Sequence, residues 1–210
     1  MKNNIIIIQS RQTSYRFPNK VLKKIGKFSL CEIIQKRLKK SKLTNKIIFA
    51  IPNNKKNRKL FEHLNTINAN VYLGSEKNVL ERYFLAAKKY KAKNIIRITG
   101  DCPLIEGRLI DEMINKFKKG KYDYVNNAKP PHFSDGFDIE IFNFKSLKDA
   151  FKNASTTIEK EHVTPYIKKN KKLNIGRFIQ VKSFDTKLSI DKPKDLKNVR
   201  KIFKFFSPNI

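Results

Sequence analysis

Four short runs rich in β-branched residues, separated by helical patterns, constrain the fold of this chain more than any other feature. The runs are 4–9, 46–51, 70–73 and 94–99. Between them, 29–40 and 78–91 place apolar residues three and four positions apart, as on one face of a helix. Continuous apolar strands joined by crossover helices are typical of a parallel sheet that is covered on both faces. The sequence therefore predicts an α/β fold with a mostly parallel sheet flanked by helices.

The second half of the chain has a different pattern and predicts a smaller region added to this sheet. Strand-like segments lie at 122–126, 137–142, 173–181 and 187–190, and helical patterns lie at 146–154, 157–169 and 194–206. Pro165 should end or kink the second of these helices, because proline lacks the backbone donor that a helix needs. Residues 128–136 form a loop that bears prolines and a glycine. No repeat or Gly/Ser linker divides the chain, so we expect one domain over 1–210.

The chain is strongly basic, with a net charge of +29 over 210 residues. Such a charge attracts polyanionic ligands and raises the alternative of a nucleic-acid-binding module. Only nine of the 47 basic residues are arginines, and the lysines are scattered along the chain. Lysine, isoleucine and asparagine are the products of A/T-rich codons, which explains the bias without a nucleic-acid function. We also find no recognition-helix, zinc-finger or RNA-binding-sheet signature, so we favour a solvated lysine surface and no specific nucleic-acid partner.

Other features narrow the class of protein. No run of about 18 apolar residues is present, so we expect neither a membrane span nor a membrane partner. The N-terminus enters a strand-like run within four residues and lacks a signal-peptide pattern, which favours a cytoplasmic protein. Cys31 and Cys102 have no partners at metal-ligand spacing and do not suggest a disulfide framework.

Charged residues gather where the predicted parallel strands end, the place where open α/β sheets bind ligands. Arg11, Arg16 and Lys20 follow the first strand, and this set of cations predicts a phosphate site, with an ordinary basic loop as the alternative. Asp101 follows the fourth strand and is a candidate Mg²⁺ ligand. Asp191 ends a strand-like run just before the last helix and is a second candidate Mg²⁺ ligand. Capping of that helix is an equally good interpretation of its position.

Seven segments, in order, resemble known nucleotidyltransferases. The stretch QSRQTSYRFPNKVL at 9–22 resembles the R-x-G-S-x-R-x-P-x-K signature of nucleotide-sugar pyrophosphorylases. The other segments are GSEKNVLERY at 74–83, RITGDCPLI at 97–105, YDYV at 122–125, DGFDIE at 135–140, EHVTPY at 161–166 and SIDKPKDL at 189–196. Together they are similar to the cytidylyltransferases of the spore-coat polysaccharide biosynthesis type, relatives of the enzymes that make CMP-activated acidic sugars.

The resemblance implies a Rossmann-like, GT-A-like nucleotidyltransferase fold, CTP and Mg²⁺ as reaction components, and a homodimer. It implies a nucleotide-binding half at 1–120 and an acceptor-binding and assembly half at 121–210. The expected reaction transfers CMP from CTP to an acidic sugar or related acceptor and releases pyrophosphate, for surface polysaccharide biosynthesis. By position, Arg11, Ser14, Arg16 and Lys20 would hold the triphosphate, Arg97 and Thr99 would line the cytidine pocket, and Asp101 and Asp191 would hold Mg²⁺. Arg11, Lys20, Asp101 and Asp191 form the expected catalytic set.

Three residues are candidates for binding the acceptor. Asp138 and Glu140 lie two apart on a predicted strand, so they would share a face and could bond sugar hydroxyls. An exposed polar strand face is the alternative. His162 could contact the substrate or the base, or be a structural helix histidine.

Three residues depart from the family pattern. Thr13 and Asn19 stand where the signature has glycine, and Lys192 stands where threonine usually follows the metal-binding aspartate. Asn tolerates positive φ better than most residues, whereas Thr adds a β-branched side chain near the phosphates. These departures leave open a catalytically weakened paralogue that acts as a partner subunit.

Overall fold

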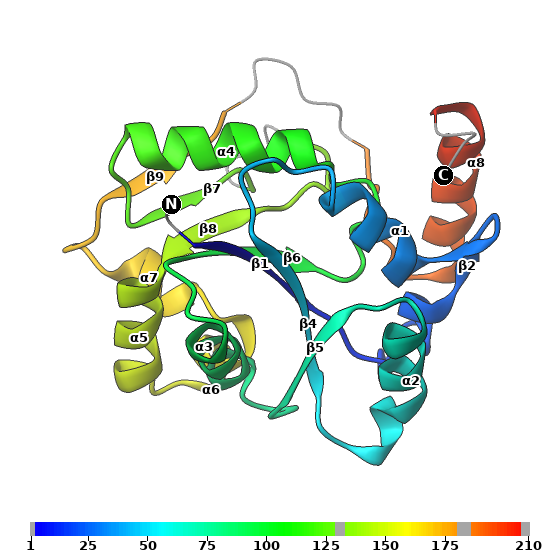
Figure 1. Cartoon of the computed structure of the whole chain (residues 1–210), viewed down its shortest axis with the longest axis horizontal. Coiled ribbons are helices and arrows are strands. Elements are labelled where there is room, and N and C mark those ends of the chain that lie inside the picture. Colours follow the sequence, from blue (N-terminus) through cyan, green and yellow to red (C-terminus); the bar gives the residue numbers. More distant parts are fainter. Residues whose placement is uncertain (1–2, 129–132, 180–185, 207–210) are drawn as a thin grey trace.

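A seven-stranded, mostly parallel sheet forms the centre of the molecule (Figure 1). The computed structural model describes residues 3–128, 133–179 and 186–206. The strand order is β5-β4-β1-β6-β8-β7-β9, with β1 (Asn4–Gln9), β4 (Lys46–Pro52), β5 (Asn70–Gly74), β6 (Asn94–Thr99), β7 (Tyr124–Asn126), β8 (Glu140–Asn143) and β9 (Ile175–Arg177). The first four of these strands in chain order pair in parallel. Their carboxyl ends therefore meet at one edge of the sheet.

Helices cover both faces of the sheet, as the sequence predicted (Figure 1). One apolar core packs against α1 (Leu30–Leu38), α2 (Arg58–Thr66) and α4 (Gly107–Lys119). The opposite core packs against α3 (Val79–Lys89), α5 (Phe144–Asn153), α6 (Thr157–His162) and α7 (Pro165–Lys169). Within the described residues, no helix has the length and apolar character needed to cross a membrane.

The isoleucine run of β1 lies at the middle of this sandwich. Ile6 and Ile8 belong to the core on one face, and Ile5 and Ile7 belong to the core on the other. All four are at most 1% exposed. Because successive strand side chains point to opposite faces, only a strand buried on both sides accommodates four consecutive isoleucines.

The two halves of the sequence share this sheet. Strand β8 from the second half pairs antiparallel with β6, and β7 pairs antiparallel with β8 and parallel with β9. A third core joins the two halves of the sequence. In it, α8 (Pro193–Phe206) packs near α1 and the hairpin of β2 (Lys24–Ile25) and β3 (Phe28–Ser29). This core places the segment that precedes α8 close to the β1 and β6 ends.

The second half also holds the corrections to the predicted elements. Residues 187–190 do not form a strand, because the amides of Leu188 and Ser189 both donate to the carbonyl of Asp135 rather than to a ladder. The strand predicted over 173–181 is reduced to β9, and its last two residues lie outside the described residues. The predicted break at Pro165 is confirmed, since α6 ends at His162 and α7 begins at Pro165.

Candidate active site

The loop that follows β1 is folded back on itself and leads a lysine into the protein. The amide of Asn19 donates to the carbonyl of Gln12 at 3.0 Å, which closes the loop. Asn19 has φ 59°, the left-handed conformation that glycine or asparagine adopts most readily. The next residue, Lys20, begins the 3-10 helix η1 (Lys20–Leu22) and is only 8% exposed. Asparagine thus meets the backbone requirement that glycine meets in the family signature.

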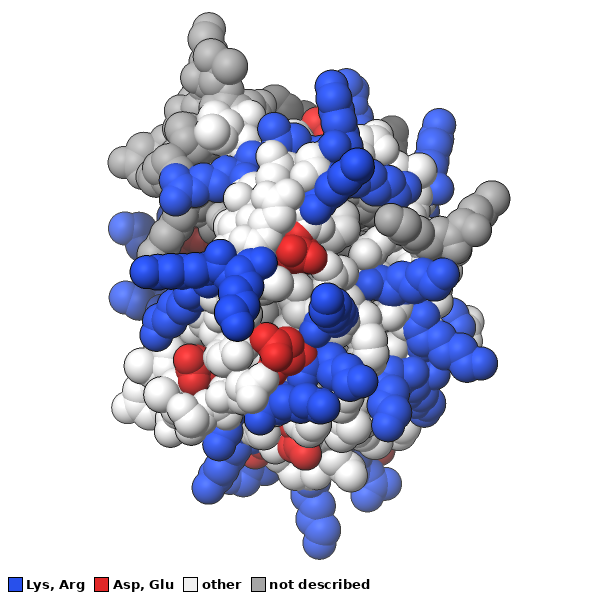
Figure 2. Space-filling view, turned by 90° about the vertical axis from the view of Figure 1, so that its left-hand side faces the viewer, with Lys and Arg blue, Asp and Glu red and all other residues white. Residues whose placement is uncertain are grey.

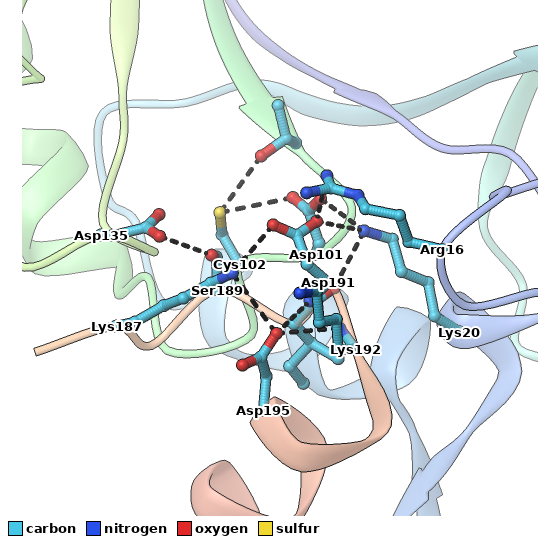
Figure 3. A network of polar contacts seen from close by, with 12 residues as sticks. Arg16, Lys20, Asp101, Cys102, Asp135, Lys187, Ser189, Asp191, Lys192 and Asp195 are labelled. Atoms are coloured by element: carbon cyan, nitrogen blue, oxygen red, sulfur yellow. Dashed lines mark hydrogen bonds and ion pairs between the residues drawn. The ribbon is translucent and has the colours of Figure 1, made fainter.

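The ammonium group of Lys20 joins the two predicted metal-binding carboxylates (Figure 3). Its Nζ lies 2.7 Å from Oδ2 of Asp101 and 3.2 Å from Oδ1 of Asp191. It also donates to the carbonyl of Ile190 at 2.9 Å. Asp101 and Asp191 are 90 residues apart in sequence, and the structure brings them to a single cation.

Asp191 is surrounded by further positive charge. Arg16 reaches its Oδ1 at 2.8 Å and Lys187 reaches its Oδ2 at 3.1 Å. Burial alone would raise the pKa of this carboxyl, but Lys187 and Lys20 outweigh that effect and hold its pKa below the usual value. Asp191 is therefore an anion held among three cations.

Helix capping is carried by a different carboxylate. Oδ2 of Asp195 accepts from the amides of Asp191 and Lys192, at 2.9 and 2.8 Å, just before α8 begins at Pro193. This is the arrangement of an acidic residue in the first turn that satisfies exposed helix donors. The side chain of Asp191 turns instead to Arg16, Lys20 and Lys187, so Asp191 does not act as the cap of this helix.

Lys192 does not supply the cation that its position suggested. Its side chain is exposed and makes no hydrogen bond or ion pair with another described residue, whereas Lys187 contacts Asp191 and Asp195. The sequence reasoning missed Lys187, because the segment that holds it was expected to be a strand. The extra charge beside Asp191 therefore comes from four residues before it.

A loop in the second half of the chain supports the Asp191 segment. Oγ of Ser189 donates to Oδ2 of Asp135 at 2.9 Å, and the amide of Ile190 donates to the carbonyl of Asp101 at 2.9 Å. Gly136 has φ 109°, and a Cβ there would lie 2.5 Å from the backbone of Leu188 and Ser189. Asp135 and Gly136 of the DGFDIE motif thus hold the segment that precedes α8 in place. In the sequence, only the glycine indicated a close backbone approach at this position.

Close packing also fixes Asp101. A Cβ at Gly100 would lie 2.1 Å from Oγ of Ser10 and 3.1 Å from the carbonyl oxygen of Gln9, so a larger residue there would force the Ser10 hydroxyl or the turn to shift. Thr99 ends β6 and its hydroxyl lies 3.1 Å from Sγ of Cys102. The two strand ends that carry Arg11 and Asp101 are therefore adjacent.

A second polar cluster lies beneath the strand ends, around Glu140. Arg97 on β6 is ion-paired with Glu140 and donates to Oε1 of Gln9 at 3.0 Å. Tyr124, Thr164 and Lys168 contact Oε1 of Glu140 at 2.6, 2.8 and 2.6 Å. Burial would raise the pKa of Glu140, but Arg97 and Lys168 hold it well below the usual value. Glu140 is thus engaged with the protein on both oxygens.

The structure separates the other acceptor candidates. Asp138 precedes β8 instead of sharing the strand with Glu140, so the expected common strand face is wrong. Asp138 is half-buried, and burial together with the charges of Asp135, Glu140 and Asp101 raises its pKa to about 6. His162 is exposed at the end of α6. Asp138 is therefore electrostatically coupled to the carboxylate site.

The other residues that were predicted to contact phosphate are more accessible than Lys20. Arg11 is exposed and Ser14 is half-buried, whereas the side chain of Arg16 is 59% exposed. Arg11 lies close enough to the buried Arg82 for its charge to lower the pKa of that group, although burial is the larger cause. The described part of the chain contains no group of three or more His, Cys, Asp or Glu placed to hold a metal. Two carboxylates and several cations therefore make up this site.

Thr13 ties the phosphate loop to two neighbouring strand ends. Its hydroxyl donates to Oε1 of Glu76 at 3.0 Å, and Nδ2 of Asn54 donates to Oε2 of the same carboxylate at 2.7 Å. Oδ1 of Asn57 in turn accepts from the amide of Gln12 at 2.7 Å. The threonine that replaces glycine is thus bonded into the surrounding loops.

Comparison with known proteins identifies the family. The sequence model of the cytidylyltransferases matches residues 5–206. The chain is 39% identical over 204 residues to the uncharacterized protein MJ1063 of Methanocaldococcus jannaschii, covering 95% of this chain and 83% of that protein. It is 28% identical over 217 residues to the spore coat polysaccharide biosynthesis protein SpsF of Bacillus subtilis, covering 97% and 87%.

A solved structure agrees with this assignment. A cytidylyltransferase from Leptospira borgpetersenii superimposes with a TM-score of 0.93 at 28% identity, covering 98% of this chain and 88% of that one. The chain belongs to the cytidylyltransferase family and is a CTP-dependent nucleotidyltransferase.

Proposed function

We propose that this protein transfers CMP from CTP to a hydroxyl of an acidic sugar, with release of pyrophosphate, in surface polysaccharide biosynthesis. The observation that carries the proposal is the convergence of Lys20, Asp101, Asp191 and Arg16 at the carboxyl ends of the parallel strands. The acceptor class rests on the family resemblance and on the similarity to a spore coat polysaccharide biosynthesis protein.

In the proposed reaction, the acceptor oxygen forms a bond to the α-phosphorus of CTP. The bond from that phosphorus to the oxygen bridging to the β-phosphorus breaks, and pyrophosphate leaves with the electron pair while the hydroxyl proton is released. Such a reaction depends on positioning and on neutralising negative charge more than on covalent catalysis. Arg11, Ser14, Arg16 and Lys20 are the proposed contacts of the triphosphate.

Asp101 and Asp191 are suited to Mg²⁺. Mg²⁺ in phosphoryl-transfer sites is commonly held by one or two carboxylates together with substrate phosphates. The protein offers two carboxylates from different loops that already share one cation, and this donor set fits the ion. When bound there, Mg²⁺ would neutralise phosphate charge and polarise the α-phosphate.

The polar cluster around Glu140 suggests how the base pocket is held. Arg97 and Thr99 are the proposed contacts of cytidine, and Arg97 is fixed by Gln9 and Glu140. We therefore assign Glu140 to positioning Arg97, in place of the acceptor contact expected from its sequence position. Asp138 and His162 remain the proposed acceptor contacts. The homodimer and the cytoplasmic location implied by the resemblance also remain proposals.

A pyrophosphate-release assay tests the proposed function. The purified protein is given each of the four nucleoside triphosphates with Mg²⁺ and a panel of acidic sugars. We expect release only with CTP and with at least one acidic sugar. Calorimetry should likewise show tighter binding of CTP than of ATP, GTP or UTP. Equal use of another nucleotide would contradict the proposal, and CTP binding without turnover would favour the partner-subunit alternative.

A further inference from the structure

We propose that Lys20 is an internal counter-ion that occupies the divalent-metal position between Asp101 and Asp191 until metal and nucleotide displace it together. The inference rests on the proposed function, because it takes these carboxylates as the metal ligands and CTP as the nucleotide. It adds an order to the binding: the metal enters the site well only when phosphates are present to receive the lysine.

The first support is that the ammonium group of Lys20 has no donor left. A lysine ammonium has three N–H groups. Its three acceptors are Oδ2 of Asp101 at 2.7 Å, the carbonyl of Ile190 at 2.9 Å and Oδ1 of Asp191 at 3.2 Å. Lys20 is 8% exposed, so solvent offers it little replacement. To bind a phosphate oxygen, Lys20 must therefore release at least one of these partners.

The second support is that Lys20 already contacts one oxygen of each carboxylate that is proposed to hold the metal, Oδ2 of Asp101 and Oδ1 of Asp191. A Mg²⁺ ion binds carboxylate oxygens at about 2.0–2.1 Å. An ammonium that already lies within hydrogen-bond distance of both carboxylates competes for their lone pairs and repels a second cation in the same place. Lys20 and a divalent ion would therefore compete for the negative charge between Asp101 and Asp191.

The third support is that the triphosphate supplies the missing partner. Phosphate oxygens are strong hydrogen-bond acceptors for an ammonium, so they can replace the carboxylate oxygens as partners of Lys20. Arg16 contacts Asp191 from the solvent side and is 59% exposed, so it can make the same exchange. Because such coupling is reciprocal, nucleotide should raise the affinity for metal by the same factor by which metal raises the affinity for nucleotide.

Two other lysines serve as comparisons. Lys187 forms ion pairs with Asp191 and Asp195 but not with Asp101, and its side chain is 41% exposed. Lys23 is exposed and lies three residues after Lys20, and among the described residues its side chain contacts the ring of Phe17 but no carboxylate. Lys23→Met therefore removes the same charge from the same segment without freeing a carboxylate.

The experiment measures Mn²⁺ binding in the absence of nucleotide, by electron paramagnetic resonance of the free ion. We compare the wild type with Lys20→Met, Lys187→Met and Lys23→Met. The wild type should bind Mn²⁺ weakly, and Lys20→Met should bind it about tenfold tighter or more, because one repelling charge has left the ligand oxygens. Lys187→Met should show a smaller gain and Lys23→Met little change. Lys20→Met binding that is no tighter than that of Lys23→Met would overturn the inference.

Thermal unfolding covers the case in which Lys20→Met folds poorly. Removing Lys20 leaves two neighbouring carboxylates without their shared cation, so the variant should unfold at a lower temperature. Mn²⁺ should restore much of that loss, while NaCl at equal ionic strength should not. A melting temperature indifferent to Mn²⁺ would also overturn the inference. The CTP assay of the wild type is independent of both readouts, so failure of the proposed function is recognised separately.

Discussion

Asp191 and Asp195 lie in the same short segment and have separable tasks. Asp191 is in contact with Arg16, Lys20 and Lys187, whereas Asp195 accepts from two backbone amides before α8. We expect Asp191→Asn to lower turnover at least about a hundredfold, because Asp191 is a proposed metal ligand and the change removes its charge but little volume. We expect Asp195→Asn to cost about 1 kcal/mol of stability, the usual scale for a helix cap, with a smaller loss of turnover.

Steady-state kinetics and chemical denaturation of the two variants check this division. The control is that Asp191→Asn keeps a cooperative unfolding transition and the wild-type helix content. Near-normal turnover of Asp191→Asn, with a loss of helix stability, would instead make Asp191 the cap of α8.

Asp138 makes stability depend on pH in an unusual direction for an aspartate. Burial and the charges of neighbouring carboxylates raise its pKa to about 6 in the folded protein, whereas an aspartate of an unfolded chain titrates near 4. Between these values the native state binds more protons than the unfolded state, so this group lowers stability as the pH rises from about 4 to about 6. Asp138→Asn should therefore raise the melting temperature relative to the wild type at about pH 7.5.

Melting temperatures of both proteins across this range provide the measurement. The advantage of Asp138→Asn should shrink as the pH falls and should vanish below about pH 4, where the aspartate is neutral in both states. A difference between the two proteins that does not change with pH would show that Asp138 titrates normally.

At the scale of elements, the loop at 11–19 is held by side chains from neighbouring strand ends. The Thr13 hydroxyl, its acceptor Glu76 and the donor Asn54 link this loop to the segments that follow β4 and β5. We expect Thr13→Val to weaken CTP binding about fivefold. The isosteric valine removes only the hydroxyl, and one partly buried hydrogen bond contributes about 1 kcal/mol. Thr13→Ser should bind CTP nearly as well as the wild type.

Isothermal titration with CTP and Mg²⁺ tests whether Thr13 supports the loop through its bond to Glu76 or merely crowds the phosphates. Thr13→Gly restores the signature residue but loses the bond to Glu76 and loosens the backbone. Tighter CTP binding by Thr13→Gly would mean that the threonine merely crowds the phosphates, and that its bond to Glu76 does not support CTP binding.

The strands of the first half were predictable because their signal is local. Runs of apolar β-branched residues gave β1 and β6 with the observed bounds, and β4 and β5 to within one residue at their carboxyl ends. The two-residue strands of the β2–β3 hairpin are too short to show a period. The strand expected at 187–190 failed for another reason: its apolar residues Leu188 and Ile190 pack in the core around α8, while its amides bond to loops.

Site residues could be predicted only where they lie at the ends of predicted strands or within the family motifs. Arg16, Lys20, Asp101 and Asp191 were named from their positions, and the structure brings these four together. Their supporting partners could not be named, because the pairs span long stretches of chain. Asp135 and Ser189 are 54 residues apart, and Lys168 reaches Glu140 from a helix. Such partners follow from tertiary packing, which one sequence does not reveal.

At the scale of the whole molecule, the charge of +29 has no single focus on the face that Figure 2 shows. Lysine and arginine side chains are spread over this face, with acidic side chains between them. A specific nucleic-acid site needs a matched groove or stripe, whereas a scattered surface attracts any polyanion through counterion release. The scattered pattern therefore predicts binding that is general and sensitive to salt.

The last prediction concerns this surface. We expect the protein to bind duplex DNA of arbitrary sequence at about 50 mM salt and to lose about a thousandfold in affinity by about 200 mM, as contacts with several phosphates require. CTP binding should fall less over the same range, because one of its proposed contacts, Lys20, is buried and weakly screened, whereas the lysines that would contact DNA are exposed. Fluorescence anisotropy with labelled duplexes, beside calorimetry with CTP, measures both. Sequence-dependent DNA binding that survives about 200 mM salt would instead establish a nucleic-acid function for the lysine surface.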